Sequence, residues 1–466
     1  MDDSINDDSD RSVDSLPPKN ELPAKEGAKI GPDGLQIETY HIEEESHDEL
    51  HEESQEEKSE DVSGPVRVKR FATLMNCMNT LLGAGILSLP LAYHHCGIIP
   101  STVMLAIIGA LSHVGSVMLM KLAARKKIDA FDQLGTAILG RWGGICISIG
   151  TMLYCISCLT TYLLIGFGTI ASWFDAGGIK VDDVLWKRVI TILVYFFAIP
   201  FPLTFPRDIK FLSPFSTLTF IATLFFVIVM IIKAATILPY PPEKKPHVTM
   251  ASFGMNIFSA ISIFGMAFAM PVVILPVMKP YNPNSWKRSL ISFWNIFIGF
   301  IFYVIPAITG YCLFGDDSKD VILDNFSSKD VLIIIVRAGF FIVVTCSYPA
   351  IALSLMESWG GLIFNDSNQQ TMVTWKRLIL IILTSIIPLV FALFLPRVGP
   401  ALSIGGAFGG CLVDFFFPAI MWIKMSKKKL YHWQNILCIL FAIFGLGSCA
   451  ISTYCAILDA IDAFTS

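Results

Sequence analysis

A short run of small residues inside the first apolar stretch could open a helix and expose its backbone. The run contains four residues that could meet a substrate: Gly83, Ala84, Gly85 and Ile86. Backbone N–H and C=O groups freed within a membrane are tolerated only where they face protein or a polar cavity. Freed N–H groups at a half-helix N-terminus suit a carboxylate, and freed carbonyls suit a cation. A small-residue surface for helix packing is the alternative, but the neighbouring polar residues Asn79 and Thr80 favour a binding site.

The sixth apolar stretch holds a second candidate break in the run from Ile263 to Pro271, where Phe264 and Phe268 flank the expected opening. Four of its residues could line a substrate pocket: Phe264, Gly265, Met266 and Phe268. We expect a substrate amine to meet the carbonyls near 264–266, and the two phenylalanine rings to form an apolar wall. The alternatives are a helix that proline kinks without breaking and ordinary packing of the two rings. A pair of interrupted helices at corresponding places in two halves of a chain is the sequence signal of a midplane binding site.

Ionisable residues within apolar stretches are functional candidates, because a charge is costly to bury in lipid. Asp414 lies well inside the tenth stretch, where it could relay a proton or pair with an Arg or Lys of the cytoplasmic side. Arg337, near the outer end of the eighth stretch, could extend toward the interface. The chain has no Walker-type phosphate loop and no polar catalytic pair in these stretches. The sequence therefore predicts neither an enzyme nor direct use of ATP.

The residues that position these sites belong to eleven expected membrane spans. Hydrophobic residues make up 54% of the chain and charged residues 15%, against about 25% charged residues in a typical soluble domain. Apolar runs bounded by charged, polar or Gly/Pro clusters predict spans near 71–97, 99–122, 143–174, 186–205, 213–233, 252–279, 286–312, 330–357, 376–396, 399–424 and 433–459. The expected fold class is an all-α polytopic membrane protein in contact with lipid, without a soluble catalytic domain.

Residues 1–65 differ sharply from the rest, since they contain 21 of the 38 Asp and Glu residues but only 5 of the 34 Lys and Arg residues. An acidic segment with few apolar residues cannot bury enough surface to fold, so we expect a disordered tail ahead of a membrane domain at 66–459. Lys and Arg are concentrated in the connections on the same side as this tail. The positive-inside rule therefore places the N-terminus in the cytoplasm.

The 11 cysteines lie in or beside apolar stretches, so we expect no disulfide between loops. Cys155-x-x-Cys158 has a spacing found in zinc sites, but no second pair and no nearby His accompanies it, and we interpret both as packing residues. We expect no cofactor other than a coupling ion. Nothing in the sequence indicates nucleic-acid binding, and we expect a monomer.

The first span resembles the signature of a known family. Residues 79–93 read Asn-Thr-Leu-Leu-Gly-Ala-Gly-Ile-Leu-Ser-Leu-Pro-Leu-Ala-Tyr, and Cys96-Gly97 follow. They are similar to the first helix of the amino acid/auxin permease family, especially its sodium-coupled neutral amino acid transporters and vacuolar amino acid transporters. The resemblance covers 66–459 and implies a five-plus-five inverted repeat in which helices 1 and 6 are discontinuous. Its parts would be repeat one at about 71–233, repeat two at about 252–424 and an extra helix at about 433–459.

The resemblance also implies a sodium site. In sodium-coupled members, a first-helix Asn and an eighth-helix hydroxyl bind the cation together with first-helix carbonyls; Asn79 matches the Asn and Thr345 the hydroxyl, with Ser347 as the second choice. Oxygen ligands suit a hard cation, although a mid-span Thr often bonds a carbonyl of its own helix instead. Many relatives carry a Cys-His pair where this chain has Met270-Pro271, so any role of that His is absent. The lack of an outer-loop disulfide favours an intracellular membrane.

Residues and resemblance together predict an ion-coupled secondary active transporter of amino acids, which we expect to be neutral ones. Transport would proceed by alternating access around a midplane site, with sodium or a proton as the coupling ion. The expected location is a vacuolar or lysosomal membrane, or the plasma membrane. The alternative is an amino acid sensor, or transceptor, that signals through its acidic tail. A channel is disfavoured because interrupted helices suit alternating access better.

Overall fold

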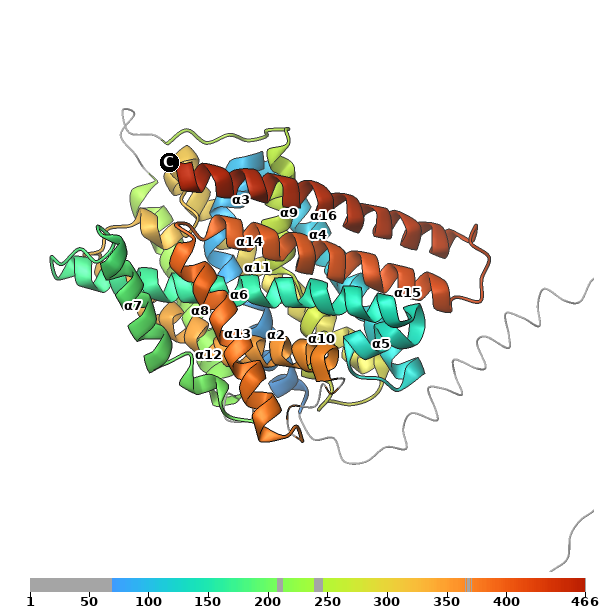
Figure 1. Ribbon diagram of the computed structural model, residues 1–466. Coiled ribbons are helices and arrows are strands. Elements are labelled where there is room, and N and C mark those ends of the chain that lie inside the picture. The colour runs from blue at the N-terminus through green and yellow to red at the C-terminus, as the bar shows by residue number, and fades with distance from the viewer. Residues whose placement is uncertain are drawn as a thin grey trace, which may run out of the picture. The chain divides into compact units, whose positions relative to one another are not determined.

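The computed structural model describes residues 69–207, 213–238, 246–364, 366, 369 and 371–465, so the expected tail at 1–65 lies outside the described residues. The described residues form helices joined by loops, without a strand among them (Figure 1). Ten of these helices are long and apolar enough to cross a membrane, and the bent pair Arg70–Leu81 and Gly85–Cys96 makes an eleventh span. The all-α polytopic fold is therefore confirmed. The five-plus-five inverted repeat stays a prediction.

The helices follow the expected spans closely. The first six spans contain α2 (Arg70–Leu81), η1 (Ala84–Ser88), α3 (Leu89–Cys96), α4 (Ile98–Lys126), α6 (Arg141–Ala176), α7 (Leu185–Ala198), η2 (Pro202–Thr204), α8 (Ser213–Ile237), α9 (Asn256–Ala267) and α10 (Pro271–Met278). The remaining spans and their connections contain α11 (Ser285–Phe314), η5 (Gly315–Asp317), η6 (Ile322–Asn325), α12 (Val331–Phe364), α13 (Thr374–Phe394), α14 (Gly399–Gly405), η7 (Gly406–Phe416), α15 (Phe417–Met425) and α16 (Trp433–Thr465). The segment η7 is a π-helix within the tenth span.

One helix was not expected from the sequence. The short α5 (Phe131–Leu139) lies between the second and third spans. Its buried residues Phe131, Leu134 and Ile138 recur every three to four positions, so one face is apolar and packs against α6. Nine residues are too few to cross a membrane, and we interpret α5 as a connecting helix.

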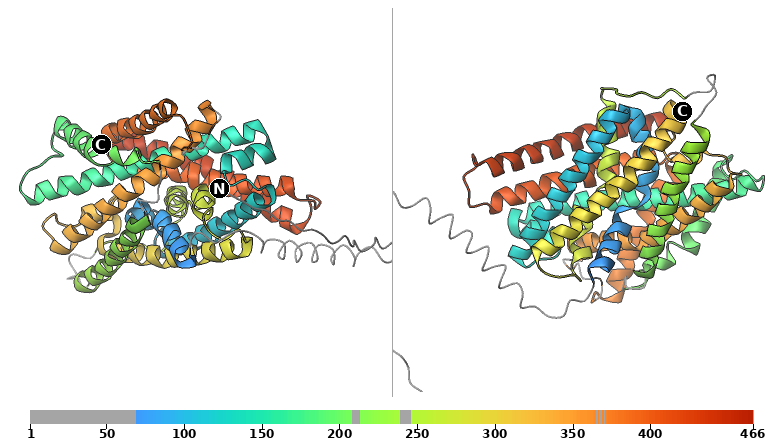
Figure 2. Two further views of the ribbon diagram at one scale, coloured as in Figure 1. Left: turned by 90° about the horizontal axis from the view of Figure 1, so that it is seen from below. Right: turned by 180° about the vertical axis from the view of Figure 1, so that it is seen from behind.

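Burial separates the central spans from the peripheral ones. In the most apolar 18-residue window of each span, 89% of the residues are buried for Asn256–Met278 and 78% for Arg141–Ala176, against 28% for Leu185–Thr204. The views from below and from behind in Figure 2 show α2, α3 and α11 side by side near these central helices. The helix α16 lies along α14 and α15 (Figure 1). Apolar side chains of the peripheral spans therefore remain available to lipid.

The first span is interrupted where the small residues stand. The helix α2 ends at Leu81, Gly83 is extended, and the chain resumes as the 3₁₀ segment η1 before α3 begins. The two halves are bent by 46°. A Cβ atom on Gly85 would lie 3.2 Å from Cα of Ala267, so this glycine lets the first span approach the end of α9 closely. The expected discontinuity is present.

The sixth span is also interrupted, but about one turn later than the sequence indicated. The helix α9 continues through residues 264–266 to Ala267, and α10 begins at Pro271. The expected opening at Gly265 is wrong, because this glycine serves close packing: a Cβ atom on Gly410 would lie 2.3 Å from the carbonyl carbon of Gly265. Pro271 sets the break instead, since it has no N–H to donate to the carbonyl of Ala267 and disfavours helical geometry at Met270.

Candidate functional site

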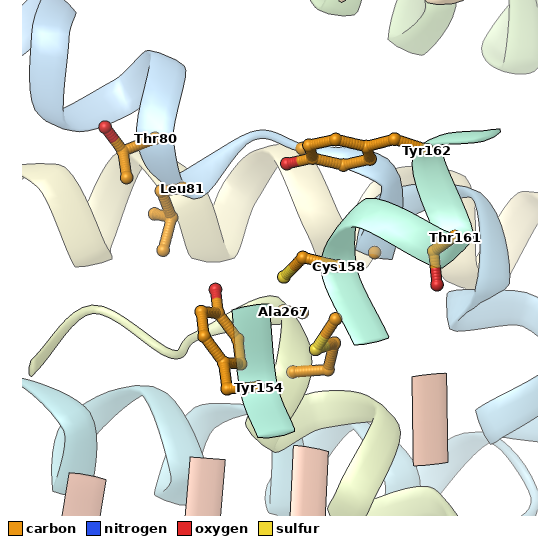
Figure 3. Close-up of a pocket in the computed structure, with 10 residues that line it drawn as sticks. Thr80, Leu81, Tyr154, Cys158, Thr161, Tyr162 and Ala267 are labelled. Atoms are coloured by element: carbon orange, nitrogen blue, oxygen red, sulfur yellow. The ribbon is translucent and has the colours of Figure 1, made fainter. Parts of the chain in front are cut away.

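A cavity lies where the two interrupted spans meet α6. Its lining residues are Thr80, Leu81, Gly83, Gly85, Tyr154, Cys158, Thr161, Tyr162, Met266 and Ala267. The space is small, about 300 Å³ when the open solvent at its mouth is included. Figure 3 shows Tyr154, Cys158 and Tyr162 on α6 facing the side on which Thr80 and Leu81 lie. Backbone of both breaks and several hydroxyl groups thus surround one small space.

Three of the expected substrate residues line this cavity, namely Gly83, Gly85 and Met266. Four others do not: Ile86, Phe264, Gly265 and Phe268. The side chain of the remaining candidate, Ala84, lies outside the described part of the structure. The two phenylalanines make edge-to-face contacts, Phe264 with Tyr93 at 6.2 Å and Phe268 with Tyr303 at 5.0 Å between ring centroids. Both therefore make the ordinary packing contacts that were the alternative to a pocket wall. A direct role of these residues in binding a substrate stays a prediction.

Sequence reasoning missed the contribution of α6. Tyr154, Cys158, Thr161 and Tyr162 occupy one face of this helix, at a spacing of three to four residues. The hydroxyl oxygen of Tyr162 lies 2.9 Å from the position that a Cβ atom on Gly83 would take. Polar side chains recurring at helical spacing in a largely buried span were the signal that could have located this wall.

Tyr303 of α11 joins the two breaks from outside the cavity. Its hydroxyl lies 2.5 Å from the carbonyl oxygen of Leu81 and 2.9 Å from that of Ala267. Leu81 is the last residue of α2 and Ala267 the last residue of α9. The side chain of Tyr303 is fully buried. This tyrosine was not a candidate from the sequence, because nothing in its local pattern marks it.

Side chains from three other helices contact residues of the sixth-span break. Ser112 of α4 donates to the carbonyl of Phe268 at 2.6 Å, and the Asn295 amide of α11 contacts the sulfur of Met270 at 3.5 Å. The N–H of Val272 donates to Oδ1 of Asp414 at 3.2 Å. Asp414 therefore caps the N-terminus of α10, where a carboxylate is favourable.

Asp414 itself is fully buried in η7. Within the described part of the chain, no hydrogen bond reaches its Oδ2 atom and no ion pair includes it. The expected partner among cytoplasmic-side Arg and Lys residues is thus not found among these residues. Its second oxygen remains available for a proton, so a proton-coupling role stays a prediction.

The expected sodium ligands contact different neighbours. Asn79 accepts a hydrogen bond from the hydroxyl of Thr219 on α8. Thr345 on α12 shares a hydrogen bond of 3.0 Å with the hydroxyl of Tyr195 on α7. The hydroxyl of Ser347 is buried and has no hydrogen-bond partner among the described residues. Thr345 and Ser347 each present a buried oxygen in the span that the resemblance indicated. The assignment of these three residues to a cation stays a prediction.

Arg337 does not extend toward the interface. Its side chain is 4% exposed, and the guanidinium donates to the carbonyl of Leu323 in η6 at 2.7 Å and to the hydroxyl of Ser172 on α6. The charge is thus buried among hydrogen-bond acceptors of η6 and α6. All eleven cysteines are free, Cys155 and Cys158 included.

The interrupted first and sixth spans, meeting at a cavity within an all-α bundle, define a polytopic membrane protein with its candidate site among the spans. Residues 68–458 match the family described as transmembrane amino acid transporter protein. The chain belongs to this family, which confirms the family that the first-span motif indicated. The family is one of transporters rather than enzymes.

Similarity to individual transporters supports membership in this family. The chain is 26% identical to the putative sodium-coupled neutral amino acid transporter 10 of Xenopus laevis and 24% identical to solute carrier family 38 member 10 of Mus musculus, in each case over 82% of its own length. It spans only 36% and 35% of those two proteins. It is also 22% identical to the sodium-coupled neutral amino acid transporter 7 of Xenopus laevis, over 77% of this chain and 81% of that protein.

Proposed function

We propose that this chain is a secondary active transporter that moves neutral amino acids by alternating access around the cavity at the two helix breaks. The observation that carries the proposal is the convergence of both breaks on one cavity within the membrane-spanning bundle. Family membership supports amino acids as the cargo, and the names of the relatives support neutral ones.

In this proposal, the two ends of the amino acid meet different parts of the site. The carboxylate binds opened backbone N–H groups between Gly83 and Ile86, at the N-terminal side of the second half of the first span. The ammonium group binds carbonyls at the C-terminal end of α9, where Met266 and Ala267 line the cavity. The tyrosine and threonine hydroxyls of the cavity supply further hydrogen bonds.

Two groups are candidates for the coupling ion. Sodium would bind Asn79, Thr345 and Ser347 together with first-span carbonyls, because oxygen ligands replace the water shell of a hard cation. A proton would bind Asp414, which caps the second half of the sixth span. The names of the relatives favour sodium.

The proposal places the N-terminus in the cytoplasm, on the distribution of Lys and Arg among the connections. The membrane would be a vacuolar or lysosomal membrane, or the plasma membrane, and the functional unit a monomer surrounded by lipid. The sensor alternative depends on a tail at 1–65 that lies outside the described residues. We propose transport as the function because the family to which the chain belongs is one of transporters.

Counterflow in proteoliposomes tests the proposal. Liposomes loaded with one unlabelled amino acid are diluted into the same labelled amino acid, and a panel of neutral, acidic and basic amino acids is compared. Concentrative uptake is then measured under a sodium gradient and, separately, under a proton gradient. We expect counterflow of neutral amino acids and concentrative uptake under at least one gradient. Binding without flux for every amino acid would indicate a sensor and overturn the proposal.

A further inference from the structure

The hydroxyl of Tyr303 contacts two carbonyl oxygens but carries a single proton. The distances of 2.5 Å to Leu81 and 2.9 Å to Ala267 both lie within hydrogen-bond range. A tyrosine hydroxyl donates one hydrogen bond at a time. The proton is therefore shared between the ends of two helices that are distant in the sequence.

Both carbonyls lack a regular helical partner for a reason that the sequence supplies. The carbonyl of Ala267 would accept from the N–H of residue 271 in a continuous helix, but that residue is a proline. The carbonyl of Leu81 would accept from Gly85, but the chain leaves the helix first, and the N–H of Gly83 bonds this carbonyl at 2.8 Å instead. Tyr303 thus satisfies acceptors that the two breaks create.

The position of Tyr303 is fixed by close packing of α11 on both breaks. A Cβ atom on Gly299, one turn earlier in α11, would lie 2.4 Å from a methyl carbon of Leu81 and 3.8 Å from the ring of Phe268. The ring of Tyr303 packs edge-to-face on Phe268. Since α11 carries both contacts, a shift of one break relative to the other must change the hydrogen bonds at this hydroxyl.

We propose that Tyr303 is a positioning residue, which holds the backbone of Leu81 and Ala267 in register on the cavity wall and so links the two interrupted spans. This inference rests on the proposed function for its effect on transport. Leu81 and Ala267 both line the cavity, whereas Tyr303 does not. Tyr303 therefore acts on the substrate through these two residues. Losing the hydroxyl frees the two helix ends to move apart and weakens substrate binding, while the ring continues to fill its space.

Transport kinetics of Tyr303→Phe test this role against a matched control. Tyr311 is also fully buried on α11, and its hydroxyl accepts the N–H of Thr249 at 3.0 Å, away from both breaks. We expect Tyr303→Phe to raise KM about tenfold with a maximal rate within about twofold of the parent, and Tyr311→Phe to leave KM unchanged. A merely structural role would lower the maximal rate with the amount of folded protein and leave KM unchanged. That result, or an equal rise of KM in both variants, overturns the proposal.

Disulfide formation tests the link without any transport assay. The pair Gly85→Cys and Ala267→Cys joins the two breaks directly, because a Cβ atom on Gly85 would lie 3.4 Å from Cβ of Ala267, close to the Cβ separation of disulfides. The pair is made in a Cys158→Ala background, since Cys158 lines the same cavity. We expect oxidation in native membranes to be at least about fivefold slower with Tyr303→Phe than with Tyr303 or Tyr311→Phe.

Equal oxidation rates overturn the proposal even if the parent protein transports amino acids. Conversely, a parent protein without flux overturns the proposed function, while a slower disulfide in Tyr303→Phe still supports the link between the breaks. Only protein inserted in the membrane is scored, so a lower yield of the variant does not affect the comparison.

Discussion

The two helix breaks differ in what opens them and in what surrounds them. The first span opens at glycines, and residues of its break line the cavity. The sixth span opens at Pro271 over three residues, and side chains of α4, α11 and η7 bond its exposed backbone and the Met270 side chain. Glycine leaves many backbone conformations accessible, whereas proline fixes one of its two backbone angles.

This difference indicates that one break is held in place while the other is free to move. The sixth-span break is held by hydrogen bonds and by the close packing of η7 on α9, where Gly410 meets Gly265. At the first-span break, the buried hydroxyl of Ser88 has no hydrogen-bond partner within the segments that the structure describes. We therefore expect the part of the first span beyond Leu81 to move during transport, and the sixth span, to which Tyr303 links Leu81, to provide the fixed surface against which it moves.

The largest expected effect follows from filling the first break. In Gly83→Val, Cβ would lie 2.9 Å from the hydroxyl of Tyr162 and the branched side chain would occupy the cavity. We expect amino acid flux in proteoliposomes to fall about 100-fold or more, since small displacements at a binding site have effects of this size. Gly168→Val is the control, because a Cβ atom there meets open space. Flux within tenfold of the parent in Gly83→Val would show that the break does not form the substrate path.

A change beside the first break tests the coupling ion. We expect Asn79→Ala to abolish the sodium dependence of uptake, because its side-chain oxygen is a proposed sodium ligand, and Thr345→Ala to do the same. Thr236→Ala on α8 is the control, since its hydroxyl is exposed and bonds carbonyls of its own helix. Initial rates are measured across a series of sodium concentrations. A sodium dependence that persists unchanged in Asn79→Ala contradicts the cation assignment.

The contrast between the breaks also explains what the sequence could and could not predict. Eleven spans and the first break follow from local patterns, because hydrophobic length and paired glycines act within one segment. The sixth-span break was misplaced because Gly265 is required by glycines of the tenth span, which no local pattern shows. Pro271, the residue that does set the break, was visible but was not given priority.

The residues that line the candidate cavity show the same limit of prediction from local sequence patterns. Gly83, Gly85 and Met266 were found from the sequence because each stands in a span with a helix-breaking pattern. Tyr154 and Tyr162 stand in a regular helix and enter the site only through the packing of α6 against the breaks. Residues whose role depends on tertiary neighbours were therefore the ones that sequence reasoning missed.

A smaller effect, on stability, is expected from disturbing the close packing of η7 on α9 that holds the sixth span. In Gly410→Ala, the new methyl group would lie 2.3 Å from the backbone of Gly265, so η7 must move away from α9. We expect a loss of about 1–3 kcal/mol in stability, as is typical for overpacking, seen as a lower thermal midpoint in detergent. Gly447→Ala on α16 is the control, because a Cβ atom there has no neighbour within 4 Å. Equal midpoints for the two variants would mean that this contact does not hold the sixth span.

The smallest expected effect is on stability, and it helps to distinguish two roles of Asp414, namely capping α10 and carrying the coupling proton. Asp414→Asn keeps an oxygen that can accept the N–H of Val272, whereas Asp414→Leu leaves this buried N–H without a partner. We expect Leu to lower stability by about 1 kcal/mol more than Asn, which is the usual size of one hydrogen bond. Uptake under a proton gradient then distinguishes capping from proton coupling, because neither variant can carry a carboxyl proton. If Asn retains proton-driven uptake and only Leu is impaired, Asp414 caps α10 and the coupling proton binds elsewhere. Loss in both variants, with sodium-driven uptake retained in Asn, would place the proton on Asp414.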